Sequence, residues 1–147
     1  MLEFSRSHGP LAYTCDFDAM PFEVDFTGYL SNTVVVRWME ALRVRMMRMH
    51  FAEIDIGARQ YLSVITRTEI EYINVVRYGE RISGTAWVDD VAGARWCVGF
   101  CFENESRQNH AISARQGGTF LSPASLRPVR VPEIIRGKFL AHRNAVT

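Results

Sequence analysis

The sequence has no long apolar run, and none approaches the roughly 20 consecutive apolar residues that a membrane-spanning helix needs. Its first ten residues carry charges of both signs and no apolar core, which is unlike a secretory signal peptide. A formal net charge of +1 leaves no excess of positive charge for a nucleic-acid or membrane-surface binder. From these absences we expect a cytoplasmic protein with no nucleic-acid partner and no membrane partner.

Cysteine and histidine are also scarce. The three cysteines, Cys15, Cys97 and Cys101, are an odd number and form no Cys-x-x-Cys pair. In a strand, Cys97 and Cys101 would lie about 13 Å apart, too far for a disulfide. We therefore expect all three to be reduced packing residues. The four histidines are scattered without metal-ligand spacing, so the sequence predicts no metal site.

A long helix is the clearest element in what is present. The 147 residues, 48% apolar and 22% charged, have the composition of one globular domain spanning 1–147. From residue 32 or 33 to about 53, apolar residues recur at spacings of three and four: Val35, Trp38, Met39, Leu42, Met46 and Met49. Such a helix is about 30 Å long. Because its apolar side must be buried, we expect a sheet to wrap around it.

Four later segments alternate with the period of two that is typical of strands: residues 61–76, 80–91, 94–105 and 110–122. The short breaks between them are typical of turns that join antiparallel neighbours. An earlier strand over residues 12–17 ends before Pro21. The predicted fold is therefore α+β, an antiparallel five-stranded sheet wrapped around one long central helix. Residues 133–147 are expected to be peripheral, as a short helix or without regular structure.

The loop before the helix carries the candidate chemistry. Glu23 and Asp25 are followed by Gly28 and then by the helix start, where Ser31 or Asn32 can cap. Unpaired N–H groups at a helix N-terminus can polarise an acyl oxygen, and a nearby carboxylate can attack it or activate water. From these residues alone, a structural role for Asp25 as a turn carboxylate explains the pattern equally well.

These segments together resemble the hotdog-fold thioesterases, specifically the 4-hydroxybenzoyl-CoA thioesterase-like group. The similarity covers residues 13–135. It is carried by residues 23–32 and 38–43, and then by residues 64–72, 77–81 and 127–133. Two positions depart from the family pattern. Tyr29 stands where the family usually has His, and Glu23 stands where it usually has Asp. The resemblance implies the hotdog fold.

The resemblance also implies roles for particular residues. Asp25 would be the catalytic carboxylate, acting as nucleophile or as general base on water. The oxyanion and substrate-binding positions would be Gly28, Tyr29, Leu30, Ser31, Asn32, Glu40 and Arg67, with the backbone N–H groups around Gly28 to Ser31, at the helix N-terminus, as the candidate oxyanion donors. Simpler roles remain open for three of them: helix cap for Asn32, exposed helix residue for Glu40, and ion pairing with Glu69 for Arg67.

The implied function is hydrolysis of an acyl-CoA or acyl-carrier-protein thioester. CoA or phosphopantetheine would be part of the substrate, so no separate cofactor is expected. A homodimer joined sheet edge to sheet edge, and a tetramer of such dimers, are also implied, with the thioester at the subunit interface. The alternative is a non-catalytic acyl-CoA-binding or sensing module with the same tunnel. A dehydratase is disfavoured because no histidine lies between His8 and His50.

Overall fold

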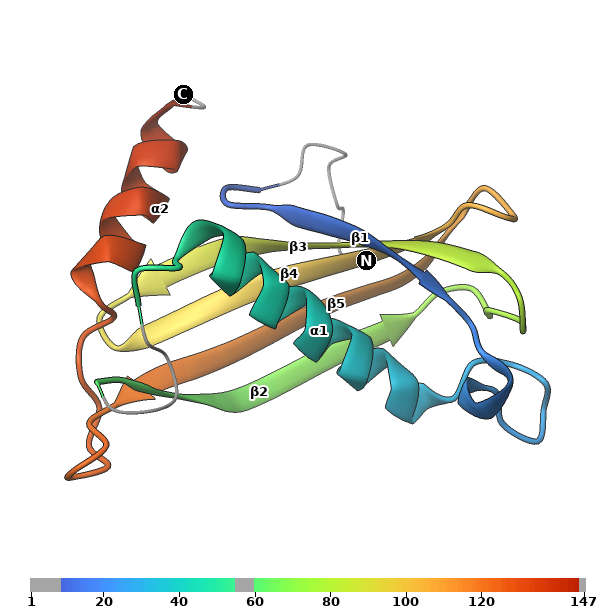
Figure 1. Cartoon of the computed structure of the whole chain (residues 1–147), viewed down its shortest axis with the longest axis horizontal. Helices are drawn as coiled ribbons and strands as arrows, with labels where there is room; N and C mark the ends of the chain where they lie inside the picture. The colour runs from blue at the N-terminus through green and yellow to red at the C-terminus, as the bar shows by residue number, and fades with distance from the viewer. Residues whose placement is uncertain (1–8, 55–59, 146–147) are drawn as a thin grey trace.

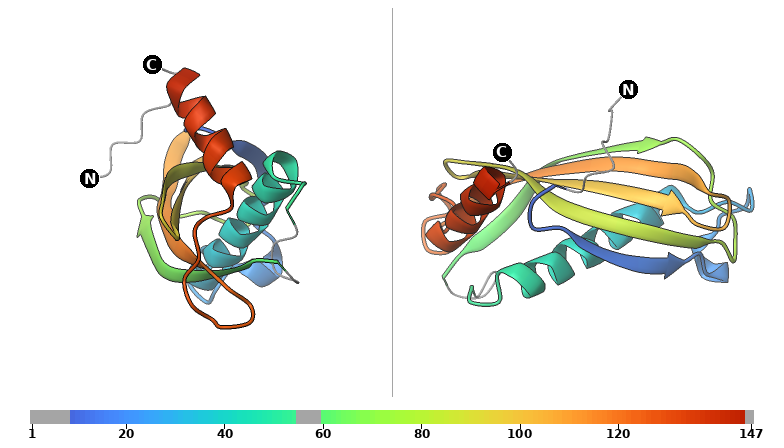
Figure 2. Two further views of the ribbon diagram at one scale, coloured as in Figure 1. Left: turned by 90° about the vertical axis from the view of Figure 1, so that its left-hand side faces the viewer. Right: turned by 90° about the horizontal axis from the view of Figure 1, so that it is seen from above.

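The computed structural model describes residues 9–54 and 60–145. In it, a five-stranded antiparallel sheet curls around one long helix, and a second helix lies at one end of the sheet (Figures 1 and 2). The elements in chain order are β1 (Tyr13–Asp18), the short 3-10 helix η1 (Pro21–Glu23), α1 (Asn32–His50), β2 (Leu62–Tyr72), β3 (Arg81–Ala92), β4 (Arg95–Asn104), β5 (Asn109–Leu121) and α2 (Glu133–Ala145). The predicted α+β fold is confirmed.

One face of α1 is buried against the sheet, as its apolar spacing predicts. The buried side chains are Val34, Val35, Trp38, Met39, Leu42 and Met46. Trp38 stacks on Phe17 of β1, with ring centroids 4.9 Å apart, and lies 6.0 Å from the ring of Phe102 of β4. The prediction that Met49 belongs to this face is wrong, because its side chain is 64% exposed. At that end of the helix Phe51 is buried instead.

The strands are arranged in the order β1-β3-β4-β5-β2. The expectation that β2 and β3 are hairpin neighbours is therefore wrong, since β2 pairs with β5 at the opposite edge. The reason is the path of the segment that connects β2 to β3. The segment after β2 crosses the end of the sheet, where the Ala111 carbonyl accepts the Asn74 N–H, and Val76 is buried beneath the loop that precedes α1. Side-chain alternation shows where a strand is but not which strand it pairs with.

Residues 133–145 form a helix that is part of the folded domain. Ile135 and Phe139 of α2 are buried in the main core. Lys138 Nζ donates to the carbonyl of His50, at 2.6 Å, and pairs with Glu53 at 3.0 Å. These contacts tie α2 to the C-terminal end of α1. Neither helix of the described chain combines the length and the apolar character needed to cross a bilayer.

Gly118 of β5 offers a test of how tightly the sheet packs. A Cβ added there would lie 2.1 Å from the Trp96 ring and 2.4 Å from the Val64 carbonyl oxygen, whereas at Gly117 the only neighbour within 4 Å is at 3.8 Å. We expect Gly118→Ala to lower the free energy of unfolding by about 1–3 kcal/mol, as overpacking does. Gly117→Ala is the matched control and should be neutral or slightly stabilising. Denaturant unfolding measures both, and equal stabilities would contradict the predicted packing.

Candidate active site

The loop between η1 and α1 holds Asp25 beside the start of the helix. The Asp25 N–H donates to the Tyr29 carbonyl at 2.9 Å, and the Gly28 N–H donates to the Asp25 carbonyl at 3.0 Å. Gly28 has φ +83°, a left-handed conformation that glycine adopts without steric cost. Val24 and Leu30 form a bridge that closes the loop. The sequence from Val24 to Leu30 therefore forms a closed turn, with Asp25 on its exposed side.

Glu23, the first acid of the pair, anchors this loop to the core. Its carboxylate accepts a hydrogen bond from Trp38 Nε1 at 3.3 Å and another from the Met20 N–H at 3.1 Å. Its carbonyl accepts the Ser31 N–H at 2.8 Å. The hydrogen bonds of the Glu23 side chain thus hold the loop against α1. Asp25 is the acid of the pair that faces a cavity.

The Asp25 carboxylate is exposed and is hydrogen-bonded on one oxygen. Thr27 donates to Oδ1 twice, through its hydroxyl and through its backbone N–H at 2.8 Å. These two hydrogen bonds lower the pKa of Asp25 below its ordinary value, and the one from the Thr27 hydroxyl has the larger effect. Within the described residues, Oδ2 accepts no hydrogen bond. One oxygen of an ionised carboxylate is therefore available to a substrate or a water molecule.

Several N–H groups that could stabilise an oxyanion are already in use. The N–H groups of Gly28 and Ser31 donate to carbonyls inside the loop, and that of Leu30 donates to the Val76 carbonyl at 2.7 Å. Among the described residues, the N–H of Tyr29 makes no backbone hydrogen bond. Asn32 and Thr33 begin α1, where N–H groups have no intrahelical partner. The donors that remain for a ligand are thus those of Tyr29 and the first turn of α1.

Asp25 lies at a cavity of about 230 Å³. The side that comes from the loop and the helix start is formed by Asp25, Thr27, Tyr29, Leu30 and Asn32, together with Val35 of α1; the other side is formed by residues 72–76 and Ile112. The Tyr72 hydroxyl donates to the Asn32 carbonyl at 3.2 Å, which links the end of β2 to the helix start. Four of the predicted site residues therefore meet in one place, with Gly28 and Ser31 in the adjoining loop.

Glu40 and Arg67 lie elsewhere. Glu40 is exposed on α1, and Arg67 is exposed on β2, where it forms an ion pair with Glu69. Neither side chain lines the cavity beside Asp25. Within one chain, the simpler roles considered for them, a solvated helix residue and a surface ion pair, account for both.

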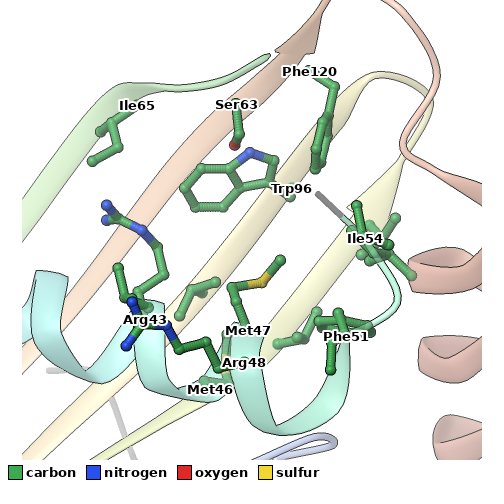
Figure 3. Close-up of a pocket in the computed structure, with 16 residues that line it drawn as sticks. Arg43, Met46, Met47, Arg48, Phe51, Ile54, Ser63, Ile65, Trp96 and Phe120 are labelled. Carbon is green, nitrogen blue, oxygen red and sulfur yellow. The ribbon is translucent and has the colours of Figure 1, made fainter. Parts of the chain in front are cut away.

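A larger cavity, of about 530 Å³, lies at the opposite end of α1 (Figure 3). It opens between the C-terminal half of the helix and strands β2 to β5, and its walls are mainly apolar: Val44, Met46, Met47, Phe51, Ile54, Ile65, Val88, Val91, Trp96, Val98, Phe120 and Ile135. Asp25 does not line it. Arg43 is about 16 Å further along the helix than Asn32, at 1.5 Å per residue. The larger cavity and the carboxylate are therefore separate within one chain.

Arg43, which lines this cavity, is a partly buried cation that the sequence analysis did not single out. Its guanidinium donates to the buried Gln116 side chain and lies 5.9 Å from the centre of the Trp96 ring. Burial lowers its pKa, while Glu40 acts in the opposite direction. The helical spacing could have indicated that Arg43 lies close to the core. Arg43 is four residues after Met39 and three before Met46, so it lies on the border of the buried stripe.

The chain matches the thioesterase-like superfamily model over residues 20–139. Among solved structures, it is 21% identical to a protein from Bacillus stearothermophilus described as a predicted thioesterase, with a TM-score of 0.77 and coverage of 89% of this chain and 96% of that one. It is 8% identical to the 1,4-dihydroxy-2-naphthoyl-CoA thioesterase from Synechocystis, with a TM-score of 0.77 and coverage of 88% and 96%. It is 12% identical to the 12:0-ACP thioesterase from Umbellularia californica, with a TM-score of 0.75 and coverage of 90% and 50%.

The fold and the match together define a hotdog-fold protein of the thioesterase class. The chain belongs to the thioesterase-like superfamily, because the family model covers most of its length. The predicted family is confirmed, and at these low identities the solved structures establish the fold. No protein of curated function matches the sequence significantly.

The Thr27 hydroxyl gives a prediction about the acidity of Asp25. In Thr27→Ala one donor to Oδ1 is lost and the backbone donor remains, so the pKa of Asp25 should rise from its lowered value towards the ordinary one. Thr27→Ser keeps the hydroxyl and should keep the low pKa. Carboxyl-carbon NMR titration, with the signal assigned by its loss in Asp25→Asn, measures both variants. An unchanged pKa in Thr27→Ala would show that the hydroxyl does not stabilise the carboxylate.

Proposed function

We propose that the protein hydrolyses acyl-CoA or acyl-carrier-protein thioesters with Asp25 as nucleophile or general base. The observation that carries this proposal is an ionised, accessible carboxylate held at a cavity beside a helix N-terminus, in a chain of the thioesterase-like superfamily. The neighbouring solved structures named as acyl-CoA and acyl-ACP thioesterases supply the two substrate classes. CoA or phosphopantetheine enters as part of the substrate.

The chemistry of a thioester suits this small set of groups. The carbonyl is already activated, so one carboxylate and a few N–H donors are enough. A positioned general base contributes roughly 10²–10⁴-fold, and loss of one oxyanion donor typically costs about 10²–10³-fold. As a nucleophile, Asp25 Oδ2 would attack the carbonyl carbon, the C–S bond would break to release the thiol, and water would hydrolyse the resulting acyl anhydride. As a general base, Asp25 Oδ2 would take a proton from the water that attacks the carbonyl carbon, and breaking of the C–S bond would again release the thiol. The N–H groups of Tyr29 and of the first turn of α1 would stabilise the oxyanion, aided by the positive end of the helix dipole.

The unpaired edge of β2 supports a homodimer as the working unit. Among the described strands, β2 has β5 as its single neighbour in the sheet. Apolar side chains are exposed along β2 and just after it: Ile65, Tyr72, Ile73 and Val75. An unpaired, partly apolar strand edge is a surface that a second chain can cover. We propose that two copies join their sheets along β2, related by a two-fold axis.

Such a dimer would bring the two cavities together. Two-fold pairing is antiparallel, so the start of β2 in one subunit lies opposite the end of β2 in the other. Ser63 and Ile65, near the start, line the larger apolar cavity, whereas Tyr72, at the end, lines the Asp25 cavity. Asp25 of one subunit would therefore act beside the large cavity of its partner, which is apolar enough to hold an acyl chain. The thioester would lie between the subunits.

The first test is thiol release from a panel of aromatic and medium-chain acyl-CoAs and acyl-carrier proteins. We expect Asp25→Asn to lower kcat/KM by at least about 100-fold, because an amide is neither base nor nucleophile. Asp90→Asn, on the exposed surface of β3, is the matched control and should keep full activity. Turnover that survives in Asp25→Asn would contradict its catalytic role and direct attention to Asn32 and Glu40. Tight acyl-CoA binding without any turnover would favour the alternative of a binding module.

The shared site is tested by subunit mixing. Asp25→Asn removes the carboxylate, and Ser63→Trp fills the larger cavity, so each homodimer should be nearly inactive. After unfolding and refolding the two variants together, half of the dimers should be mixed, and one of the two sites in each mixed dimer would have both parts intact. About a quarter of wild-type activity should return. Each variant refolded alone is the control. No recovery, or a monomer in sedimentation, would contradict a site between subunits.

A further inference from the structure

Three side chains of metal-binding type meet on the face of the sheet that points away from α1. Cys101 Sγ lies 3.4 Å from Glu103 Oε1 and 3.7 Å from His110 Nδ1, and the last two atoms are 2.7 Å apart. The three residues offer one sulfur, one oxygen and one nitrogen within 4.8 Å of one another. This cluster is distinct from the cavity of Asp25, and none of its residues has a role in the proposed hydrolysis.

The cluster is formed by the register of β4 and β5. Glu103 is paired with His110, while the preceding pair is Phe102 with Ile112, so the register passes over Ala111. Without this bulge, strict alternation would place His110 on the same face as Ile112, which lies in the core. The extra residue turns His110 to the outer face, where Cys101 and Glu103 already point. Re-aiming one side chain is a recurrent use of β-bulges beside functional sites.

The separations suit a tetrahedral ion. With bonds of about 2.3 Å to sulfur and about 2.0–2.2 Å to nitrogen and oxygen, ligand atoms around zinc lie roughly 3.4–3.6 Å apart. The two separations that involve Cys101, 3.4 and 3.7 Å, are already close to these values. Only Glu103 and His110, which are hydrogen-bonded at 2.7 Å, would have to separate, and the Glu103 side chain is about half exposed and able to move.

Ser113 orients the histidine for this role. Its Oγ lies 2.6 Å from His110 Nε2. When Nε2 carries the proton and donates to this hydroxyl, Nδ1 presents its lone pair towards Cys101 and Glu103. Histidine ligands in metal sites usually have such a partner on the other ring nitrogen, which fixes the tautomer and the ring orientation.

The same residues do not form a nucleophilic site. Ser113, which could complete a Ser-His-Glu arrangement, is only 1% exposed, so a substrate cannot reach its hydroxyl. Burial, together with the nearby Glu103 carboxylate, raises the pKa of Cys101 to about 12, so its thiol is protonated at neutral pH. A divalent cation changes this balance, because it compensates the negative charge of both the carboxylate and the thiolate.

We propose that Cys101, Glu103 and His110 bind one zinc-class divalent ion on the outer face of the sheet, through Sγ, one carboxylate oxygen and Nδ1, with water as the fourth ligand. The donor set of sulfur, nitrogen and oxygen is one that zinc accepts in tetrahedral sites. Binding releases the Cys101 thiol proton to solvent. The ion would link β4 to β5 close to their hairpin turn.

The test uses the tag-free full chain, freed of metal with a chelator and titrated with CoCl₂ and then with ZnCl₂. We expect one Co²⁺ per chain with a thiolate-to-cobalt charge-transfer band, displacement by Zn²⁺, and release of about one proton per ion. Cys101→Ser should abolish the band and weaken Zn²⁺ binding by more than about 100-fold, and Ser113→Ala should weaken it by about tenfold. Glu103→Gln, at a half-exposed position, keeps the side-chain shape and should also weaken binding.

Cys97→Ser is the matched control, because Cys97 lies on the same strand and face but outside the cluster, and it should bind as the wild type does. Thermal unfolding of each variant without metal separates loss of a ligand from loss of fold. Absence of the cobalt band in the wild type, unchanged Zn²⁺ affinity in Cys101→Ser and Glu103→Gln, or loss of the band in Cys97→Ser would each overturn the proposal.

Discussion

Burial of one side of α1 in the concave face of the sheet is the interaction on which the rest of the structure depends. Six side chains of the helix are buried, and fully burying a large apolar side chain contributes about 1.5–3 kcal/mol. Trp38 does more than fill space: its ring stacks on Phe17, and its Nε1 donates to Glu23 in the loop that carries Asp25. The packing that stabilises the domain therefore also fixes where the helix begins and where the carboxylate lies.

The same packing leaves one edge of the sheet uncovered. α1 packs mainly on β1 and β3. Among the described strands, none lies beside the outer edge of β2, the edge opposite β5 (Figure 1). The two cavities lie at opposite ends of this strand. A second copy that pairs with β2 would cover its exposed apolar side chains and place a carboxylate beside an apolar cavity. The same pairing along β2 would then both stabilise the dimer and complete the active site.

At the end of the sheet near Asp25, a hydrogen bond links the Asp25 cavity to the strand segment that carries the cluster on the outer face. The Asn74 side chain donates to the His110 carbonyl at 2.7 Å, and Asn74 also lines the Asp25 cavity. His110 in turn belongs to the cluster with Cys101 and Glu103 on the outer face. An ion that held His110 in place would therefore act on a main-chain position in direct contact with the wall of the proposed active site.

The sequence alone determined what depends on local periodicity and on family resemblance: the long helix, the positions of the strands, the α+β class and the thioesterase-like family. It also identified the loop with Asp25, because a carboxylate, a glycine and a helix start are close together in the chain. Tertiary structure alone decided that β2 pairs with β5, that Glu23 anchors the loop while Asp25 faces a cavity, and that Arg43 donates a hydrogen bond to the buried Gln116. It also decided that a bulge turns His110 towards Cys101 and Glu103. The physical reason is common to all four. A local sequence pattern is the same for every possible tertiary arrangement, whereas contacts between residues distant in sequence depend on which partner and which register bury the most apolar surface.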